Sequence, residues 1–431
     1  MSDTLTPSGL QSSAGLYGQC GVYQFDRNGA IFNPLDLNPY LLFDAESSMI
    51  GTLENPTLDL DPTKQESLDV ITATRAGTAT FVNLNGEIEI AQPNTVRVDN
   101  SLGYPAILVE PSATNLVTYS EDFSHSSWLK NAVGTGVAPE ITLNAAESPD
   151  GTQNATKVVF DAGSGTSTND LSTLEDLFSA TNGASYTQSI YLKGETGGEK
   201  ILVRNAGLNA YTTLTLTTEW ARYEVTETAA QTFGYYSIGI RQGLGGVVLN
   251  SKITVYAYGA QVEAGSVATS LIRTAGSNVT RAADDLVISG SAFSDFYNQS
   301  EGTFYVESVP NENTSGSFLF DLSFGDASTD RLNIFNGSGN QKVFLRTAGT
   351  TWSDNIIGSR PAGGVFSRVA ISYKTNDVRA SLDGVNMTTD PSATISSTLN
   401  KMTIGNRYQN PNYLNGRIRR LIFWPYHSDS L

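Results

Sequence analysis

Residues 79–90 read Ala-Thr-Phe-Val-Asn-Leu-Asn-Gly-Glu-Ile-Glu-Ile, and this stretch indicates the fold class of the chain. Apolar and polar residues alternate on both sides of the pair Asn85-Gly86. Alternation with a period of two is typical of a half-buried strand, and Asn-Gly is a strong hairpin signal because both residues tolerate positive φ. The stretch therefore predicts a β-hairpin. Asp383-Gly384 follows another alternating run and predicts a second one.

Short alternating runs continue through the middle and the last third of the chain, with Gly, Asn and Asp between them. Leu171–Phe178 is the only helix candidate, and we expect it to be a short crossing turn. Serial short strands separated by turn residues are typical of β-sandwiches and jelly rolls. The sequence therefore predicts an all-β protein with tandem β-sandwich (jelly-roll) domains.

The expected organisation has five parts. They are an N-terminal attachment segment at 1–40, a small hairpin-rich β unit at 41–118, a jelly roll at 119–270, a linker at 271–285 and a second jelly roll at 286–431. The linker contains Thr-Arg-Ala-Ala at 280–283, which echoes Thr-Arg-Ala-Gly at 74–77 but is too short to define a repeat.

The N-terminal segment has scattered glycines and aromatic residues without a strand or helix period. Such a segment makes no core of its own, so its aromatic side chains are candidates for docking onto another protein. The alternative is a partly ordered tail. The attachment candidates are Tyr17, Tyr23, Phe25 and Phe32.

Charge and composition exclude several classes of protein. The formal net charge is −17 and only 16% of residues are charged, so the basic surface that nucleic-acid binding requires is missing. No run of about 18 apolar residues predicts membrane insertion, and the N-terminus lacks the pattern of a signal peptide. Cys20 has no second cysteine to pair with. His125 and His427 are the only histidines, so we expect no metal and no cofactor.

Several segments resemble bacteriophage tail-fibre and other virion structural proteins. Residues 71–82 and 108–116 carry this resemblance, and residues 218–223 and 258–265 are similar to late strands of a carbohydrate-binding-module-like jelly roll. The last block resembles a laminin-G-like, concanavalin-type jelly roll, on residues 373–377, 382–385 and 414–418.

The resemblance implies a tail-fibre, tail-tip or head-fibre protein that is assembled in the host cytoplasm and resides in the virion. Its implied partners are other virion proteins, host surface polysaccharide and further copies of itself, with a trimer favoured. Two alternatives stay open: a purely structural capsid or tail decoration protein, and a polysaccharide depolymerase.

A glycan site needs flat aromatic rings for the sugar C–H surface, with amide, carboxylate or guanidinium groups around them. Tyr235 and Tyr236 are adjacent in a predicted strand, so their rings point to opposite faces and only one belongs to the core. Trp128 and Tyr211 are further candidates in the middle jelly roll. Trp220 is assigned to the core, because the resemblance makes it a structural strand residue.

The last jelly roll has aromatic residues in polar segments, where ligand contacts are common. Its candidates lie in residues 349–355 and 406–413, and they are Trp352, Arg407, Tyr408 and Tyr413. The alternative is that these segments pack against a neighbouring subunit.

Catalysis is not expected. Glycoside cleavage needs two carboxyl groups at a defined separation, and spacing along the sequence does not establish such a pair. Asp321, Asp326 and Asp330 fall within ten residues, a density that is more typical of a solvated turn than of a calcium site. We therefore predict a binding protein and not an enzyme.

Overall fold

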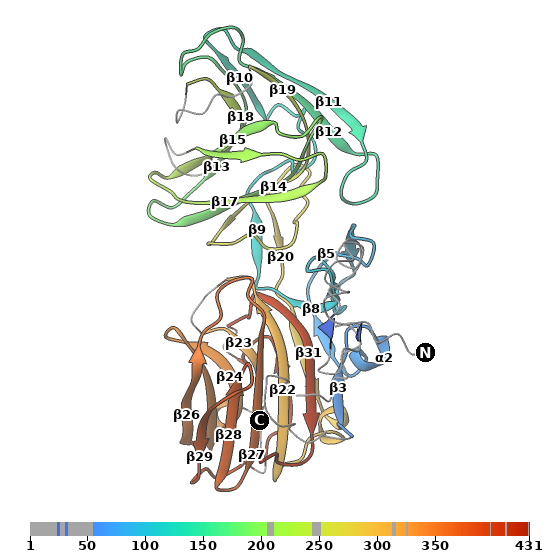
Figure 1. The fold of residues 1–431 in the computed structure, drawn as a ribbon, viewed down its shortest axis with the longest axis vertical. Helices are drawn as coiled ribbons and strands as arrows, with labels where there is room; N and C mark the ends of the chain where they lie inside the picture. Colours follow the sequence, from blue (N-terminus) through green and yellow to red (C-terminus); the bar gives the residue numbers. More distant parts are fainter. Residues whose placement is uncertain are drawn as a thin grey trace, which may run out of the picture.

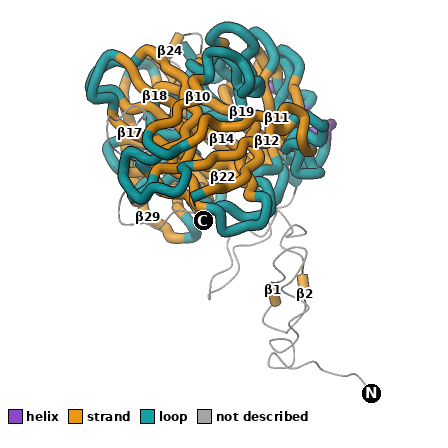
Figure 2. Tube along the Cα trace, turned by 90° about the horizontal axis from the view of Figure 1, so that it is seen from above, coloured by secondary structure: helices purple, strands orange, loops and turns teal. Residues whose placement is uncertain are grey.

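The computed structural model describes residues 24–25, 31–32, 55–204, 211–243, 251–312, 316–324, 326–396, 398–409, 412–429 and 431. Strands dominate this part of the chain, and the short helices lie at one side (Figure 2). The fold is all-β, as predicted. Two sandwiches are stacked along the long axis of the molecule (Figure 1). No helix in these ranges is long and apolar enough to cross a membrane.

The lower sandwich in Figure 1, which we call the parent domain, has two large antiparallel sheets. One has the order β26 (Thr350–Ser359), β25 (Asn340–Thr347), β24 (Asp326–Gly337), β23 (Phe318–Phe324), β30 (Lys401–Ile404), β21 (Asp285–Ser289) and β4 (Thr72–Thr74). The other has the order β29 (Val385–Asp390), β28 (Asp377–Leu382), β27 (Ser367–Lys374), β22 (Glu301–Pro310), β31 (Gly416–Trp424), β8 (Ala106–Val109) and β7 (Val98–Asp99), with β3 (Leu58–Leu60) also paired to β31. The core between them is aliphatic and aromatic, and includes Phe304, Phe320 and Phe423.

The upper sandwich, the inserted domain, is built from two five-stranded antiparallel sheets. The first has the order β10 (Leu129–Val133), β13 (Leu171–Ser179), β18 (Phe233–Arg241), β15 (Lys200–Arg204) and β16 (Thr212–Thr215). The second has the order β11 (Val137–Ala146), β12 (Ala155–Asp161), β19 (Lys252–Ala264), β14 (Ser185–Gly194) and β17 (Ala221–Thr228). Their facing side chains form a second, separate core.

Residues 41–118 do not form the independent unit that we expected. Strands β3, β4, β7 and β8 complete the two sheets of the parent domain, where β4 pairs with β21 and β8 with β31. The chain then leaves through β9 (Ala113–Asn115), builds the inserted domain and returns through β20 (Val279–Arg281), which pairs with β9 (Figure 1). One sandwich is therefore inserted into the sequence of the other, because the edge strands of the parent domain come from both sides of the insertion.

The predicted linker at 271–285 contains β20 and two members of a buried charge cluster, Arg281 and Asp284. Arg75 and Arg281, from the two Thr-Arg-Ala segments, meet the carboxylates of Asp284 and Glu110, and Arg97 lies between these carboxylates. All five side chains are at most 2% exposed. These ion pairs tie the segments that enter and leave the inserted domain to the parent domain.

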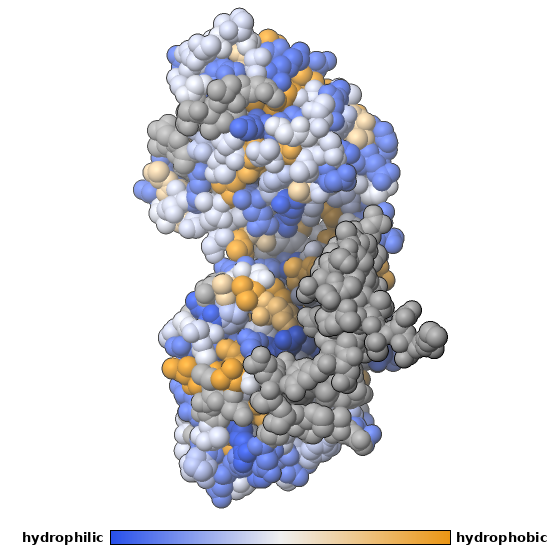
Figure 3. Space-filling model, in the orientation of Figure 1, coloured by the Kyte–Doolittle hydropathy of each residue, from blue (hydrophilic) through white to orange (hydrophobic). Residues whose placement is uncertain are grey.

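A hairpin formed by β5 (Ala79–Val82) and β6 (Ile88–Ala91) reaches from the parent domain toward the inserted domain. Ile88 packs there against Tyr258 and Leu271, and Figure 3 shows hydrophobic residues around this narrow junction. The turn places Gly86 at φ +83°, while Asp383 and Gly384 form the two-residue turn between β28 and β29 with φ of +51° and +81°. Both predicted hairpins are confirmed.

The helix expected at Leu171–Phe178 is wrong, because this segment is strand β13. Its apolar residues have a helix-like spacing, but β10 and β18 pair with it along both edges. Leu174 and Phe178 enter the core, whereas Leu177 on the other face is exposed. Strand pairing on both sides has overridden the local pattern. The remaining short elements are α2 (Gln65–Leu68), α3 (Ser291–Ser294) and the paired strands β1 (Gln24–Phe25) and β2 (Ile31–Phe32).

Candidate functional site

The outward face of the sheet β10-β13-β18-β15-β16 carries a cluster of aromatic and charged side chains. In β18, Tyr236 and Ile238 point into the core, so Tyr235 and Arg241 lie on the opposite face. Strand register places Arg204 beside Ser237 and therefore on this face as well. We call this cluster the arginine–tyrosine face; it consists of Asn131, Glu175, Arg204, Tyr211, Tyr235 and Arg241.

Arg204 is the centre of the arginine–tyrosine face. Its guanidinium carbon lies 4.7 Å from the ring centroid of Tyr235 and 5.4 Å from that of Tyr211. Its Nη2 is 3.4 Å from Glu175 Oε1. Cation–π contacts of this kind are worth about 0.5–2 kcal/mol. They hold two tyrosine rings and a guanidinium next to one another on a half-buried surface.

Glu175 fixes the position of Arg204. Its carboxylate also accepts hydrogen bonds from Asn131 Nδ2 at 2.8 Å, from Ser237 Oγ at 3.1 Å and from Thr173 Oγ1 at 3.2 Å. These donors come from β10, β18 and β13, which lie side by side in the sheet. The lone pairs of Glu175 are therefore engaged by protein groups, and the carboxylate acts as a support for Arg204.

Tyr211 joins the two arginines. Its hydroxyl oxygen accepts hydrogen bonds from Arg241 Nη1 at 3.1 Å and from Arg204 Nη1 at 3.3 Å. A phenol has one proton and accepts at most two hydrogen bonds. The Tyr211 proton is therefore available to an acceptor beyond these arginines. Arg241 donates its Nε to the carbonyl of Thr168, and no described carboxylate lies within ion-pair distance of it.

The surroundings of the cluster are apolar. Leu129, Val133 and Leu177 lie on the same face and are 47%, 50% and 54% exposed. Exposed leucine and valine side chains beside tyrosine rings and fixed hydrogen-bonding groups form an amphipathic surface. Such a surface suits a ligand with both C–H and hydroxyl groups, as a sugar has.

The aromatic candidates of the middle jelly roll divide between core and surface. Tyr236 and Trp128 are in the core, 0% and 2% exposed, with their ring centroids 5.3 Å apart. They are not binding platforms, because burial leaves no ring face for a ligand. Tyr235 is half-buried on the outer face, so the alternation predicted for this pair is correct. Trp220 is half-buried at the domain junction and not in the main core, and its indole donates to the Glu147 carbonyl at 3.0 Å.

The candidates of the last jelly roll do not form one compact site. Lys401 Nζ lies 3.9 Å from the ring centroid of half-buried Tyr408. A hydrogen bond from Lys401 to the Tyr408 hydroxyl and the positive charge of Lys401 lower the pKa of Tyr408. Arg407 lies over Phe318 with 5.8 Å between guanidinium and ring. Their proposed glycan contacts stay predictions.

Tyr413 and Trp352 differ from these two candidates in what the structure shows of their side chains. The Tyr413 hydroxyl donates to Asp285 Oδ1 at 2.9 Å and its ring packs against the parent-domain core, so it is a poor platform for a ligand. Burial, followed by the charge of Asp285, raises the pKa of Tyr413. Trp352 belongs to β26, and its side chain is outside the described part of the structure.

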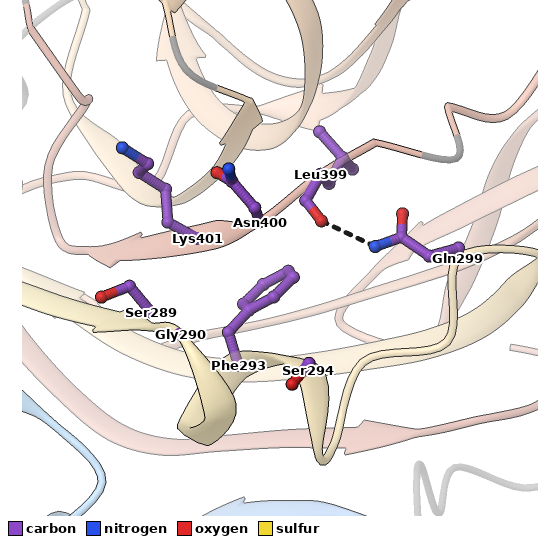
Figure 4. Close-up of a pocket in the computed structure, with 8 residues that line it drawn as sticks. All are labelled: Ser289, Gly290, Phe293, Ser294, Gln299, Leu399, Asn400 and Lys401. Carbon is purple, nitrogen blue, oxygen red and sulfur yellow. Dashed lines mark hydrogen bonds between the residues drawn. The ribbon is translucent and has the colours of Figure 1, made fainter.

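A pocket of about 320 Å³ adjoins Tyr408 through Lys401. Figure 4 shows the ring of Phe293 between the segment Leu399–Lys401 and the start of α3. Gln299 donates to the Leu399 carbonyl at 2.6 Å across one end of the pocket. The pocket is polar at its rim, but Phe293 is only 2% exposed and offers no open ring face.

One group of side chains has the composition of a metal site. Ligand atoms of Asp377, His427 and Asp429 lie within 4.8 Å of one another. Arg379 donates to both oxygens of Asp377 at 2.8 Å, and Lys374 Nζ is 3.7 Å from both aspartates. The two cations already balance the two carboxylates, so a divalent ion would have to displace them. Of the acidic residues considered from the sequence, Asp321 is fully buried against Arg331 at 3.4 Å and does not line an open loop.

The attachment candidates lie largely outside the described residues. Tyr17 and Tyr23 are not described, and Phe25 and Phe32 belong to β1 and β2 without described side chains. Their docking role stays a prediction.

Sequence reasoning missed the charged members of the arginine–tyrosine face. A signal was present for Arg241, which lies six residues after Tyr235 and so shares its face in a strand. Glu175 gives no such signal, because the apolar residues of Leu171–Phe178 have the spacing of a helix. Arg204 gives none either, because strand pairing alone brings it to Tyr235.

Residues 281–428 match the model of the concanavalin A-like lectin/glucanases superfamily of laminin G type. This match covers most of the parent domain and agrees with its two-sheet architecture. No curated protein matches the chain.

Solved structures with similarity to the chain include carbohydrate-binding modules and laminin G domains. Domain 4 of the arabinanase AbnA from Geobacillus stearothermophilus is 13% identical over 35% of this chain and 69% of its own, with a TM-score of 0.29. The CBM40 domain of a Ruminococcus gnavus sialidase is 14% identical over 31% and 79%, with a TM-score of 0.26. Mouse laminin α1 domains LG4-5 are 10% identical over 57% and 84%, with a TM-score of 0.25.

Proposed function

We propose that this chain is a bacteriophage virion protein that binds a host-surface glycan through the arginine–tyrosine face of its inserted domain. The observation that carries the binding part is the position of Arg204, held by Glu175 between the rings of Tyr235 and Tyr211. A ligand that meets this face finds its donors already oriented. Preorganised groups lose little conformational entropy on binding, which favours affinity.

The mechanism is adsorption without bond cleavage. Tyr235 offers a ring to the sugar C–H surface, while Arg241 and Tyr211 donate hydrogen bonds to its oxygens. The one carboxylate of the face, Glu175, is occupied by four protein donors and is not placed to act as a general acid. Several copies on one particle would convert modest affinities into firm attachment.

The virion part of the proposal rests on the resemblance of residues 71–82 and 108–116 to phage structural proteins. In this role residues 1–40 attach the protein to a tail or a head, and the two stacked sandwiches project outward. A trimer is the proposed assembly. The acidic net charge of −17 is compatible with an exposed particle component.

Binding is tested with the full chain and polysaccharides extracted from candidate host cells, while reducing ends are measured in the same tubes. We expect saturable binding without new reducing ends, and a loss of at least about tenfold in affinity for Tyr235→Ala. The matched control is Tyr256→Ala, since Tyr256 is also a half-buried tyrosine under a cation, Lys193, but lies on the other sheet of the same domain.

Each remaining outcome contradicts part of the proposal. Release of reducing ends would establish a depolymerase, and absence of binding to every extract would leave a structural decoration role. Equal binding by both tyrosine variants would move the site to the parent domain, where Trp352→Ala and Tyr408→Ala are the next changes to test. For attachment, a chain without residues 1–40 should still bind glycan but no longer enter particles. Normal incorporation of this truncated chain would refute the anchor role.

A further inference from the structure

We infer that the glycan recognised at the arginine–tyrosine face is acidic, and that Arg241 and Tyr211 bind its anionic group. The inference rests on the proposed function and specifies its ligand: a sugar carrying a carboxylate, or a sulfate or phosphate ester.

The charge of this face is opposite to that of the protein. Its described basic residues are Lys200, Arg204 and Arg241, and its one described acidic residue is Glu175. The whole chain has 26 Lys+Arg against 43 Asp+Glu. A local excess of positive charge on a strongly acidic protein attracts anions to this face and repels them from most of the remaining surface.

Arg241 is the arginine of this face whose charge no described carboxylate balances. Arg204 is neutralised by Glu175 at 3.4 Å, whereas Arg241 has only uncharged described partners, the Thr168 carbonyl and the Tyr211 hydroxyl. A guanidinium presents five N–H donors in a planar fork that matches the two oxygens of a carboxylate or an ester oxyanion. Arg241 is also partly exposed, so a ligand can reach it without moving the core.

Tyr211 adds the directional element. Two guanidinium groups donate to its oxygen, so its hydroxyl proton must be donated away from them. Hydrogen bonding from two cations also makes this O–H a stronger donor. An oxyanion placed beside Arg241 accepts this proton in a charge-assisted hydrogen bond, which is stronger than one to a neutral sugar hydroxyl.

The test uses the polysaccharide fraction that retains the full chain, untreated and after selective removal of its acidic groups. One sample has its carboxyl groups reduced to alcohols with carbodiimide and borohydride, and another has its sulfate and phosphate esters removed. We expect one of the two treatments to lower affinity at least about tenfold, and this treatment identifies the anion. Added salt should weaken binding to the untreated fraction.

Variants connect the anion to the proposed residues. Arg241→Gln and Tyr211→Phe should each weaken binding to the acidic fraction severalfold or more, with Arg241→Lys between wild type and Arg241→Gln because it keeps the charge and loses the fork. The charge-matched control is Lys252→Gln, an exposed lysine on the other sheet of the inserted domain, which should leave affinity within about twofold.

The outcomes separate this inference from the proposed function. Undiminished binding to the fraction after both treatments, or an Arg241→Gln variant that binds the acidic fraction like wild type, would overturn the inference and leave glycan binding intact. Failure to bind the untreated fraction at all would instead remove the proposed function, and the inference with it.

Discussion

Arg75 and Asp284 are separated by 209 positions in the sequence, yet Arg75 Nη1 lies 2.9 Å from Asp284 Oδ1 with both side chains buried. Arg75 follows β4 and Asp284 precedes β21, the strand to which β4 pairs. The ion pair therefore joins the two parts of the parent domain that lie before and after the inserted domain in the sequence. Arg97 contacts the same aspartate and also Glu110, so removal of one acid leaves buried positive charge without compensation.

We expect Asp284→Asn to destabilise the protein by about 3–5 kcal/mol, because breaking a buried charge network leaves arginines unpaired in a low-dielectric environment. Urea unfolding at neutral pH measures this change. Glu195→Gln is the control: Glu195 pairs with Lys157 at 3.3 Å, but the two side chains are 44% and 34% exposed, and we expect a cost below about 1 kcal/mol. Equal costs for the two variants would mean that the network does not stabilise the junction.

The same network predicts acid sensitivity. Burial alone raises the pKa of Glu110, but the charges of Arg281 and Arg97 and the hydrogen bonds from Ser270 outweigh it and hold this pKa well below the usual range. A lowered folded-state pKa contributes stability above the unfolded-state pKa of about 4.3, and this stability is lost as the pH falls below that value. The free energy of unfolding should therefore decline from about pH 5 downward. Glu110→Gln should be less stable at neutral pH and show a shallower decline; an unchanged slope would contradict this.

The adjacent residues Tyr235 and Tyr236 should respond oppositely to alanine substitution. Tyr236 is fully buried beside Trp128, so Tyr236→Ala should cost about 3–5 kcal/mol of stability. Tyr235→Ala should cost no more than the about 0.5–2 kcal/mol of its cation–π contact with Arg204 and act mainly on glycan binding. Thermal unfolding of both variants, with binding assayed below the transition, separates the two roles. A large loss of stability for Tyr235→Ala would make this residue structural.

A substitution at Gly405 tests how closely β8, which precedes the inserted domain, packs against the last jelly roll. Its φ is +68°, and an added Cβ would lie 2.8 Å from Cγ1 of Val109, which is fully buried in β8. Gly405→Ala should therefore cost about 1–3 kcal/mol more than Gly339→Ala. Gly339 has φ +80° and open space at the Cβ position, so it controls for backbone strain. Similar unfolding temperatures for the two variants would show that Val109 yields to the methyl group.

Chelation should not change the stability of the protein. Lys374 and Arg379 already balance Asp377 and Asp429, so we expect no shift in unfolding temperature on addition of EDTA or of zinc. A rise of several degrees with zinc that is abolished in His427→Gln would instead establish a metal site at the end of the chain.

The fold class followed from local pattern, whereas the assembly of strands did not. Alternation around Asn85-Gly86 and before Asp383-Gly384 predicted hairpins that exist. The short strands β3, β4 and β8 have no pattern that indicates their partners β31 and β21, which lie beyond the inserted domain in the sequence. Likewise Leu171–Phe178 had the spacing of a helix, and only β10 and β18 on its two edges made it a strand.

The candidate site was predictable in kind but not in position. Alternation correctly gave Tyr235 and Tyr236 opposite faces, yet nothing in the order of residues told which of them was buried. Arg204, Glu175 and Tyr211 lie on three separate segments, and their meeting depends on the order of strands in the sheet.

What the sequence by itself determined is the β character of the chain and its turns, since strand alternation and positive φ are properties of a few neighbouring residues. Only the tertiary structure decided that one sandwich interrupts the other, that five buried charges meet where the chain passes between them, and that Arg241 lies beside Tyr211 with no carboxylate partner among the described residues. The physical reason is that pairing between strands, burial and charge compensation are set by residues brought together across long separations in the chain.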